Sequence, residues 1–117
     1  MFTTVTQDMR IANEEMFGPV LSVIKWKDAE KMLEQVNGVE YGLTGSVWTI
    51  SLANAYRAAN HMESGYIWVN NVSAYFLGAS FGGYKHSGIG REEGYDEPRI
   101  LYLRRETGFV LLERGAY

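Results

Sequence analysis

Two short stretches of this chain carry residue types that could hold a ligand. The first places two neighbouring carboxylates, Glu14 and Glu15, and the ring of Phe17 just before a Gly-Pro turn. The second packs five glycines into the thirteen residues 82–94, around one aromatic ring and one lysine. Carboxylates accept hydrogen bonds, flat rings can wall a ligand, and glycines let backbones approach closely. Together the two stretches are typical of part of an enzyme site.

Several kinds of catalytic chemistry are excluded by composition. The chain has no cysteine, so it contains no disulfide, no thiolate metal site and no thiol nucleophile. Its two histidines, His61 and His86, lie far apart and lack the spacing of metal ligands. No serine stands in the Gly-x-Ser-x-Gly setting of a hydrolase nucleophile. We therefore assign no residue of this chain as catalytic and none as a metal ligand.

Hydrophobic periodicity predicts an alternation of strands and helices ahead of the glycine-rich stretch. Apolar clusters predict strands at residues 20–26, 43–50 and 66–69. Asp28 and Ser51 are expected to cap the two helices between them, which end at Asn37-Gly38 and before Gly65. This order predicts an α/β fold, a parallel sheet with crossover helices.

The remaining residues are predicted to form a long loop and a tail. Residues 70–94 follow neither the helical nor the strand period, and a loop this long in a small domain is more often functional than idle. Apolar runs at residues 100–103 and 109–112 predict a last strand or strand pair. The expected architecture therefore ends in a glycine-rich loop and a C-terminal β tail.

The order of these motifs resembles a known family. Glu-Glu-x-Phe-Gly-Pro-Val, a strand ending in Val69-Asn70, and Phe-Gly-Gly-x-Lys-x-Ser-Gly-x-Gly-Arg-Glu-x-Gly from Phe81 are similar to the C-terminal part of the catalytic domain of NAD(P)-dependent aldehyde dehydrogenases. The resemblance covers nearly the whole chain, with Ser80 standing where proline is usual. It implies a partial catalytic domain over residues 1–98 and an oligomerisation-type β tail over residues 99–117.

The resemblance also implies roles for particular side chains. Glu15 would hold the nicotinamide ribose of NAD or NADP, because a carboxylate can accept two hydrogen bonds from a vicinal diol. Phe17 would lie against the nicotinamide ring. Tyr75, Phe76 and Phe81 would shape the aldehyde side, where bulky rings select substrates by shape.

Plainer interpretations of the same residues stay open. Glu14 and Glu15 also suit a solvated carboxylate pair, and Phe17 suits a core side chain. Tyr75 and Phe76 equally suit loop anchors that pack on the sheet.

The glycine-rich stretch has a structural interpretation of its own. Its glycines do not follow a predicted strand, which argues against a dinucleotide-binding fingerprint. We expect them to permit turns with positive φ, and we expect Lys85 and Arg91 to tie the loop by hydrogen bonds.

The function implied by the resemblance is oxidation of an aldehyde to a carboxylic acid with NAD(P)+ through a cysteine thioester. Because the chain has no cysteine, we expect it to be inactive alone. Because the resemblance is already under way at the first residue, we expect the chain to be the C-terminal portion of a longer enzyme. One alternative is a stand-alone, non-catalytic module that associates with itself or a partner through its loop and tail. Another is an unrelated small α/β domain.

Bulk properties set the expected partners and location. The formal charge is −3 and the basic residues are dispersed, so nucleic acid is not an expected partner. No apolar run reaches the length of a membrane span, and no secretory signal is visible, so a cytoplasmic location is expected. The expected partners are an aldehyde in the parent enzyme and other copies of the chain. Strands cut from a larger sheet predict marginal stability or self-association.

Overall fold

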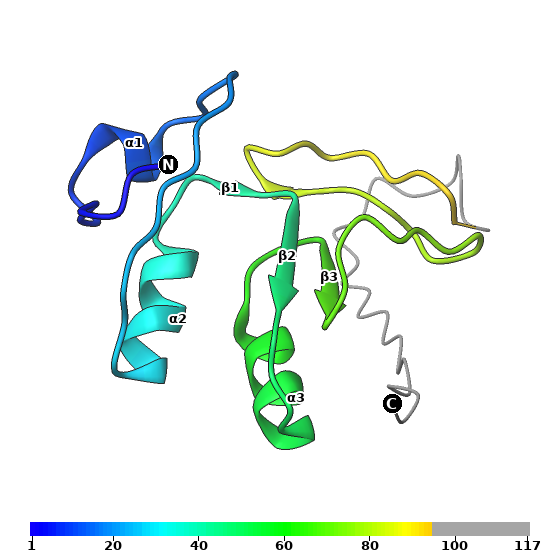
Figure 1. Cartoon of the computed structure of the whole chain (residues 1–117). Helices are drawn as coiled ribbons and strands as arrows, with labels where there is room; N and C mark the ends of the chain where they lie inside the picture. The colour runs from blue at the N-terminus through cyan, green and yellow to red at the C-terminus, as the bar shows by residue number, and fades with distance from the viewer. Residues whose placement is uncertain (95–117) are drawn as a thin grey trace. The chain divides into compact units, whose positions relative to one another are not determined.

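The structure is a computed structural model that describes residues 1–94 of the chain (Figure 1). The chain divides into two compact units, Met1–Glu40 and Tyr41–Tyr117. The predicted β tail, residues 99–117 with its strands at 100–103 and 109–112, lies outside the described residues.

The first unit holds two helices, α1 (Arg10–Asn13) and α2 (Ala29–Asn37). The predicted cap of α2 is confirmed: the Asp28 carboxylate accepts hydrogen bonds from the backbone N–H groups of Glu30 and Lys31, at 2.9 and 3.3 Å. These donors have no partner inside the helix, so the cap fixes where α2 begins.

The strand predicted at residues 20–26 is wrong. Within the described part of the chain this segment makes a single β-bridge, between Ser22 and Phe2. Its two hydrogen bonds run from the Phe2 N–H to the Leu21 carbonyl and from the Val23 N–H to the Phe2 carbonyl, both at 2.8 Å. An apolar run indicates burial, but a strand also needs a ladder with a neighbour, and the sequence does not name that neighbour.

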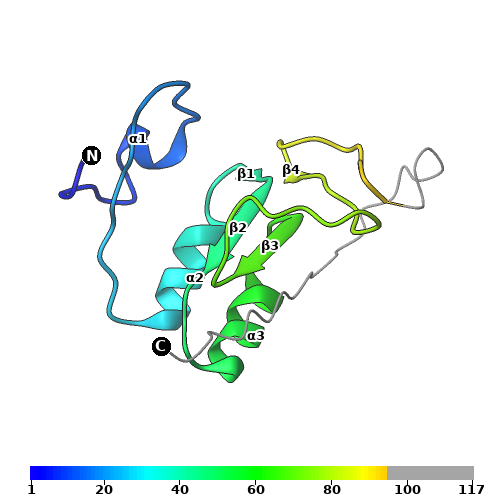
Figure 2. The same ribbon diagram turned by 45° about the vertical axis from the view of Figure 1, so that its right-hand side comes forward.

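The second unit contains the predicted pair of parallel strands joined by a helix. Strand β2 (Thr44–Val47) pairs in parallel with β3 (Tyr66–Val69), and α3 (Leu52–His61) connects them. Figure 2 shows β2 and β3 side by side with α3 alongside them. The Ser51 hydroxyl accepts a hydrogen bond from the Asn54 N–H at 3.3 Å, which confirms the predicted cap. The observed β2 is shorter than the predicted strand at 43–50.

A second, smaller sheet was not predicted. Strand β1 (Tyr41–Gly42) pairs antiparallel with β4 (Tyr84–Lys85), which lies inside the predicted loop. The described residues therefore form two two-stranded sheets and not one three-stranded parallel sheet. A strand of two residues shows no period, so β4 has no signal in the sequence.

The core of the second unit lies around β3. Ala55 and Ala59 of α3 are buried, as are Tyr66, Ile67 and Trp68 of β3. Since successive side chains of a strand point to opposite faces, Tyr66 and Trp68 share one face of β3 and Ile67 lies on the other.

Candidate functional site

Residues 14–20 of the first unit form an exposed turn that presents Phe17. The Gly18 N–H donates to the Met16 carbonyl at 2.9 Å, and the Val20 N–H donates to the Gly18 carbonyl at 2.7 Å. The Phe17 ring is 95% exposed. The interpretation of Phe17 as a core side chain is therefore wrong, and the ring is free to contact a ligand.

The two neighbouring carboxylates of this turn differ in their surroundings. Glu14 forms an exposed two-bond ion pair with the Arg10 guanidinium, with Arg10 Nη2 to Glu14 Oε2 at 2.8 Å. The hydrogen bond from Arg10 lowers the pKa of Glu14. Glu15 makes no hydrogen bond or ion pair with any described residue. Glu15 is thus the carboxylate that can still accept hydrogen bonds from a ligand.

The second unit contains four aromatic rings that are linked by ring contacts, which we call the aromatic cluster: Tyr66, Trp68, Tyr75 and Phe81. The Tyr75 ring meets the Trp68 ring edge-on, with centroids 5.6 Å apart at 82°. It meets Phe81 in the same way, at 5.1 Å and 86°. Tyr66 lies within ring-contact distance of the other three. The structure thus brings Tyr75 and Phe81 together.

Phe76 follows Tyr75 in the chain but stands apart from the aromatic cluster. Its side chain is 42% exposed, and it makes no ring contact within residues 1–94. Tyr75 is 49% exposed although its ring is held by its neighbours. The contacts of Tyr75 agree with the loop-anchor interpretation, and about half of the residue stays exposed.

Sequence reasoning missed Tyr66 and Trp68 as members of this cluster. Both were assigned only to a strand. The signal was present in their spacing, because residues two apart on a strand share a face. What the spacing could not show is which loop residues cover that face.

The Asn70 side chain forms hydrogen bonds with the backbone of Thr49. It donates to the Thr49 carbonyl at 2.8 Å and accepts from the Thr49 N–H at 2.9 Å. The Asn70 N–H also donates to the Val47 carbonyl at 2.8 Å. Although Asn70 stands at the carboxyl end of β3, where α/β proteins place ligand contacts, its amide extends the pairing of β2 and β3.

Lys85 and Arg91 tie the glycine-rich loop, as predicted. Arg91 Nη1 donates to the Gly83 and Gly90 carbonyls at 2.9 and 2.8 Å. Lys85 Nζ forms an ion pair with Glu63 Oε2 at 2.7 Å. One guanidinium nitrogen that donates to two backbone carbonyls fits a structural role for Arg91.

The glycines of this loop serve mainly for close approach, which corrects the expectation of positive φ. Of the glycines in residues 82–94, only Gly88 has a positive φ, at 116°. A side chain on Gly82 would collide with the Gly90 carbonyl, and one on Gly94 would collide with the Ser80 hydroxyl. The missing Cβ atoms make room for neighbouring backbone.

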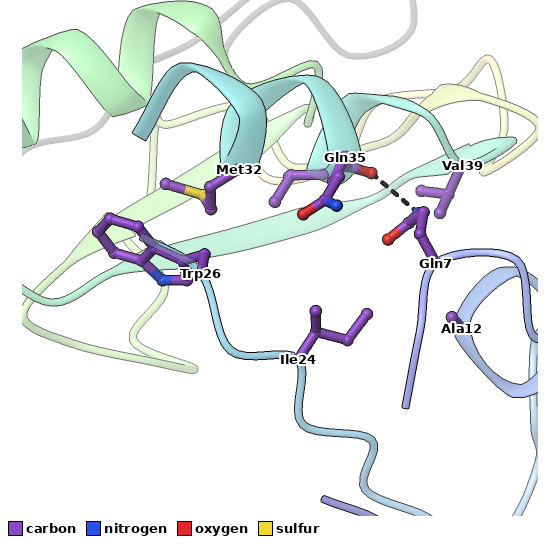
Figure 3. Close-up of a pocket in the computed structure, with 8 residues that line it drawn as sticks. Gln7, Ala12, Ile24, Trp26, Met32, Gln35 and Val39 are labelled. Atoms are coloured by element: carbon purple, nitrogen blue, oxygen red, sulfur yellow. Dashed lines mark hydrogen bonds between the residues drawn. The ribbon is translucent and has the colours of Figure 1, made fainter. Parts of the chain in front are cut away.

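The first unit also has an open apolar groove of about 330 Å³ (Figure 3). Its lining residues are Gln7, Ala12, Ile24, Trp26, Met32, Gln35, Val36 and Val39. The Gln7 side chain donates to the Gln35 carbonyl at 3.2 Å. None of the five predicted site residues lines this groove, and no titratable side chain does. The groove therefore offers no chemistry of its own.

The described residues contain neither a candidate metal site nor a membrane-spanning helix. Residues 1–94 contain no cluster of side chains that could hold a metal ion. None of the helices in this part of the chain has the length and apolar character needed to cross a bilayer.

Comparisons with known proteins agree with this geometry. The model of the aldehyde dehydrogenase family matches residues 1–102. Aldehyde dehydrogenase tropH of Talaromyces stipitatus is 50% identical over 97 residues, which cover 83% of this chain and 19% of that protein. Retinaldehyde dehydrogenase 3 of Homo sapiens is 46% identical over 94 residues, covering 80% of this chain and 18% of that protein.

A solved structure gives the same result for the fold. The NAD+ complex of an aldehyde dehydrogenase from Bacillus cereus aligns with a TM-score of 0.76 and 43% identity, over 80% of this chain and 19% of that one. The parallel strand pair with its connecting helix places the chain among α/β proteins. The chain belongs to the aldehyde dehydrogenase family. It spans about a fifth of the length of the relatives it matches.

Proposed function

We propose that the protein containing this chain oxidises an aldehyde to a carboxylic acid with NAD(P)+. In this proposal residues 1–117 bind and orient the reactants, and the nucleophilic cysteine comes from elsewhere in the enzyme, since none of these residues is a cysteine. The bound NAD(P)+ supplies a hydride acceptor. The observation that carries the proposal is the exposed carboxylate of Glu15, which has no partner within residues 1–94. It lies two residues from the exposed Phe17, and both stand at the positions where the family's motif has them.

Glu15 and Phe17 fit the nicotinamide end of the cofactor. A carboxylate with no partner among the described residues can accept hydrogen bonds from both hydroxyl groups of a ribose. The Phe17 ring can cover one face of a planar nicotinamide and keep water from it. Glu14 suits this role less well, because Arg10 already occupies its two oxygens.

Tyr75, Phe76 and Phe81 are proposed to line the path of the aldehyde. Tyr75 and Phe81 are held edge-on to each other, so their open faces have a defined direction. Phe76 contributes an exposed ring from the next position of the loop. Rings held in this way select aldehydes by shape. We also retain, as a proposal, the division into residues 1–98 and an oligomerising tail at 99–117.

The test uses a chimera in which this chain replaces the segment that it matches in the Bacillus cereus enzyme. The chimera is expected to form NADH in the presence of an aldehyde. Glu15→Gln in the chimera is expected to lower kcat/KM for the cofactor about tenfold to a hundredfold, as expected for lost charge-assisted hydrogen bonds. Steady-state kinetics with the cofactor varied measure this effect.

Glu14→Gln is the matched control. It changes the neighbouring carboxylate in the same way but removes only an exposed ion pair, so kcat/KM is expected to stay within about twofold. Equal effects of the two substitutions would contradict the role given to Glu15. A folded chimera without aldehyde-dependent NADH formation would contradict the proposed function itself.

No observation within residues 1–94 favours a non-catalytic association module over part of an enzyme. The tail on which that hypothesis depends lies outside the described residues. The family match covers the segment that bears the ligand-type residues.

A further inference from the structure

The indole of Trp68 connects β3 to the loop that bears Tyr75. Trp68 is only 4% exposed, and its Nε1–H donates to the Ala74 carbonyl at 2.6 Å. Ala74 directly precedes Tyr75 in the chain. One hydrogen bond therefore fixes the loop backbone, relative to a buried strand, at the residue before a proposed substrate ring.

The same indole also fixes ring orientation. Its ring meets Tyr75 edge-on at 5.6 Å, and Tyr75 meets Phe81 edge-on at 5.1 Å. Aromatic pairs prefer this arrangement and are stabilised by it beyond the burial of area. A shift of Trp68 would therefore be passed to both rings that we propose to line the aldehyde path.

The backbone between Trp68 and Tyr75 is held in a conformation that needs support. Asn70 and Ser73 have positive φ values of 52° and 58°, which are uncommon for residues other than glycine. Such conformations persist when neighbouring contacts hold them. Asn70 has its paired hydrogen bonds with Thr49. Next to Ser73, the Val72 N–H donates to the Asn71 side chain, and the Ala74 carbonyl accepts the bond from Trp68, which is the one that ties this backbone to β3.

We propose that Trp68 is a positioning residue for aldehyde selection, a role that rests on the function proposed above. Trp68 does not touch the aldehyde. Its N–H sets the conformation of residues 73–76, and that conformation sets where the rings of Tyr75 and Phe76 stand. Loss of the N–H lets the loop relax and alters recognition of aldehydes large enough to reach these rings.

The first test measures Trp68→Phe in the Bacillus cereus chimera with a bulky and a small aldehyde, benzaldehyde and acetaldehyde. Phenylalanine keeps an aromatic ring but has no N–H donor. We expect KM for benzaldehyde to rise about threefold to tenfold, the range for one lost hydrogen bond. The KM for acetaldehyde, the KM for the cofactor and kcat are expected to stay within about twofold.

Trp48→Phe is the matched control, because Trp48 is 66% exposed on the same unit. It is expected to leave both aldehyde KM values unchanged. Equal rises in KM for benzaldehyde and acetaldehyde, or no rise with either, would overturn the positioning role. If the unsubstituted chimera has no aldehyde-dependent activity, the proposed function fails first, so the two failures are distinguishable.

A second variant and readout do not depend on activity. Replacing Trp68 by benzothienylalanine keeps the shape of the indole and exchanges its N–H for sulfur. In the Bacillus cereus chimera, hydrogen exchange is expected to become faster at residues 73–76 and to stay unchanged in α2. Unchanged exchange at residues 73–76 would show that the loop does not need this bond and would overturn the inference.

Discussion

At the scale of single residues, the phenol of Tyr66 links burial to acidity. Tyr66 is 1% exposed, and burial is the main cause that raises its pKa above the ordinary value of 10.0. The nearby Phe76 backbone acts in the opposite direction and lowers this pKa, but its contact lacks the geometry of a hydrogen bond, so the hydroxyl has no partner within residues 1–94. A buried hydroxyl without a partner lowers stability at neutral pH by about 1–3 kcal/mol, because it has lost its hydrogen bonds to water.

The raised pKa of Tyr66 gives the sign of a pH effect. Below pH 10 both the folded and the unfolded chain keep the phenol proton. Above it the unfolded chain loses the proton first, so the free energy of unfolding falls as the pH rises toward the folded-state pKa. Tyr66→Phe is expected to remove this part of the fall and to raise the free energy of unfolding at neutral pH by about 1 kcal/mol, because it removes a buried hydroxyl that has no partner among the described residues. Urea unfolding across the alkaline range measures both.

Tyr56→Phe is the control for Tyr66→Phe, because Tyr56 is 45% exposed on α3. It is expected to keep the alkaline loss of stability seen in the unsubstituted chain. Identical pH profiles for the chain and Tyr66→Phe would show that the buried phenol is not linked to folding.

At the same scale, the sequence predicts which residues could form the site but not the surroundings of those residues. Residue type and spacing were enough to select Glu15 over other carboxylates by resemblance. Only the structure shows why Glu14 is unsuited, since the pairing with Arg10 depends on the helical turn α1. The contribution of Trp68 was invisible because its partner, the Ala74 carbonyl, is a backbone atom.

At the scale of elements, β3 and the glycine-rich loop pack backbone against backbone. A Cβ on Gly65, just before β3, would overlap the Gly82 carbonyl. Gly65→Ala is therefore expected to lower the free energy of unfolding by about 3 kcal/mol or more, because neither backbone can move without breaking its own contacts. Chemical denaturation of the two chains measures the difference.

Gly90→Ala, in the glycine-rich loop, is the matched control for Gly65→Ala. A Cβ on Gly90 meets no atom within 4 Å, and its φ is not positive. The expected change is within about 0.5 kcal/mol. A small effect of Gly65→Ala, equal to that of Gly90→Ala, would show that the backbone contact is not tight in solution.

Elements whose signals are local were predicted well, and those that depend on distant partners were not. Asp28 and Ser51 cap the helices that they were predicted to cap, because a cap depends on residues two or three positions away. Strand β3 has the predicted bounds, since its residues are buried on both faces. The segment at 20–26 failed as a strand and β4 was missed, because pairing is decided by residues far away in the chain.

At the scale of the whole chain, many large apolar side chains are exposed. Four of them are each more than two-thirds exposed: Phe17, Ile50, Leu77 and Ile89. The tryptophans Trp26 and Trp48 are more than half exposed. Surfaces of this kind favour association. We expect the isolated 117-residue chain to form concentration-dependent oligomers in sedimentation velocity experiments.

Ile50→Lys provides the comparison for this prediction. Ile50 is fully exposed, so lysine is accommodated without strain and is expected to shift the chain toward monomer. Asn54→Lys adds the same charge on α3 without removing an apolar side chain and is expected to have little effect. A monomer that melts cooperatively at every concentration would contradict the expectation of self-association.

The pairing of β1 with β4 makes the intervening backbone a closed ring. Closing a ring of roughly 40 residues costs about 3 kcal/mol in chain entropy. The few hydrogen bonds of a two-residue ladder contribute about 1 kcal/mol each, so in an open chain they would scarcely offset this cost. The ring can close because β2, α3 and β3 already bring its ends near each other. Formation of the β1–β4 sheet therefore depends on the β2–β3 sheet. Any substitution that loosens the β2–β3 pair is expected also to break the β1–β4 pair.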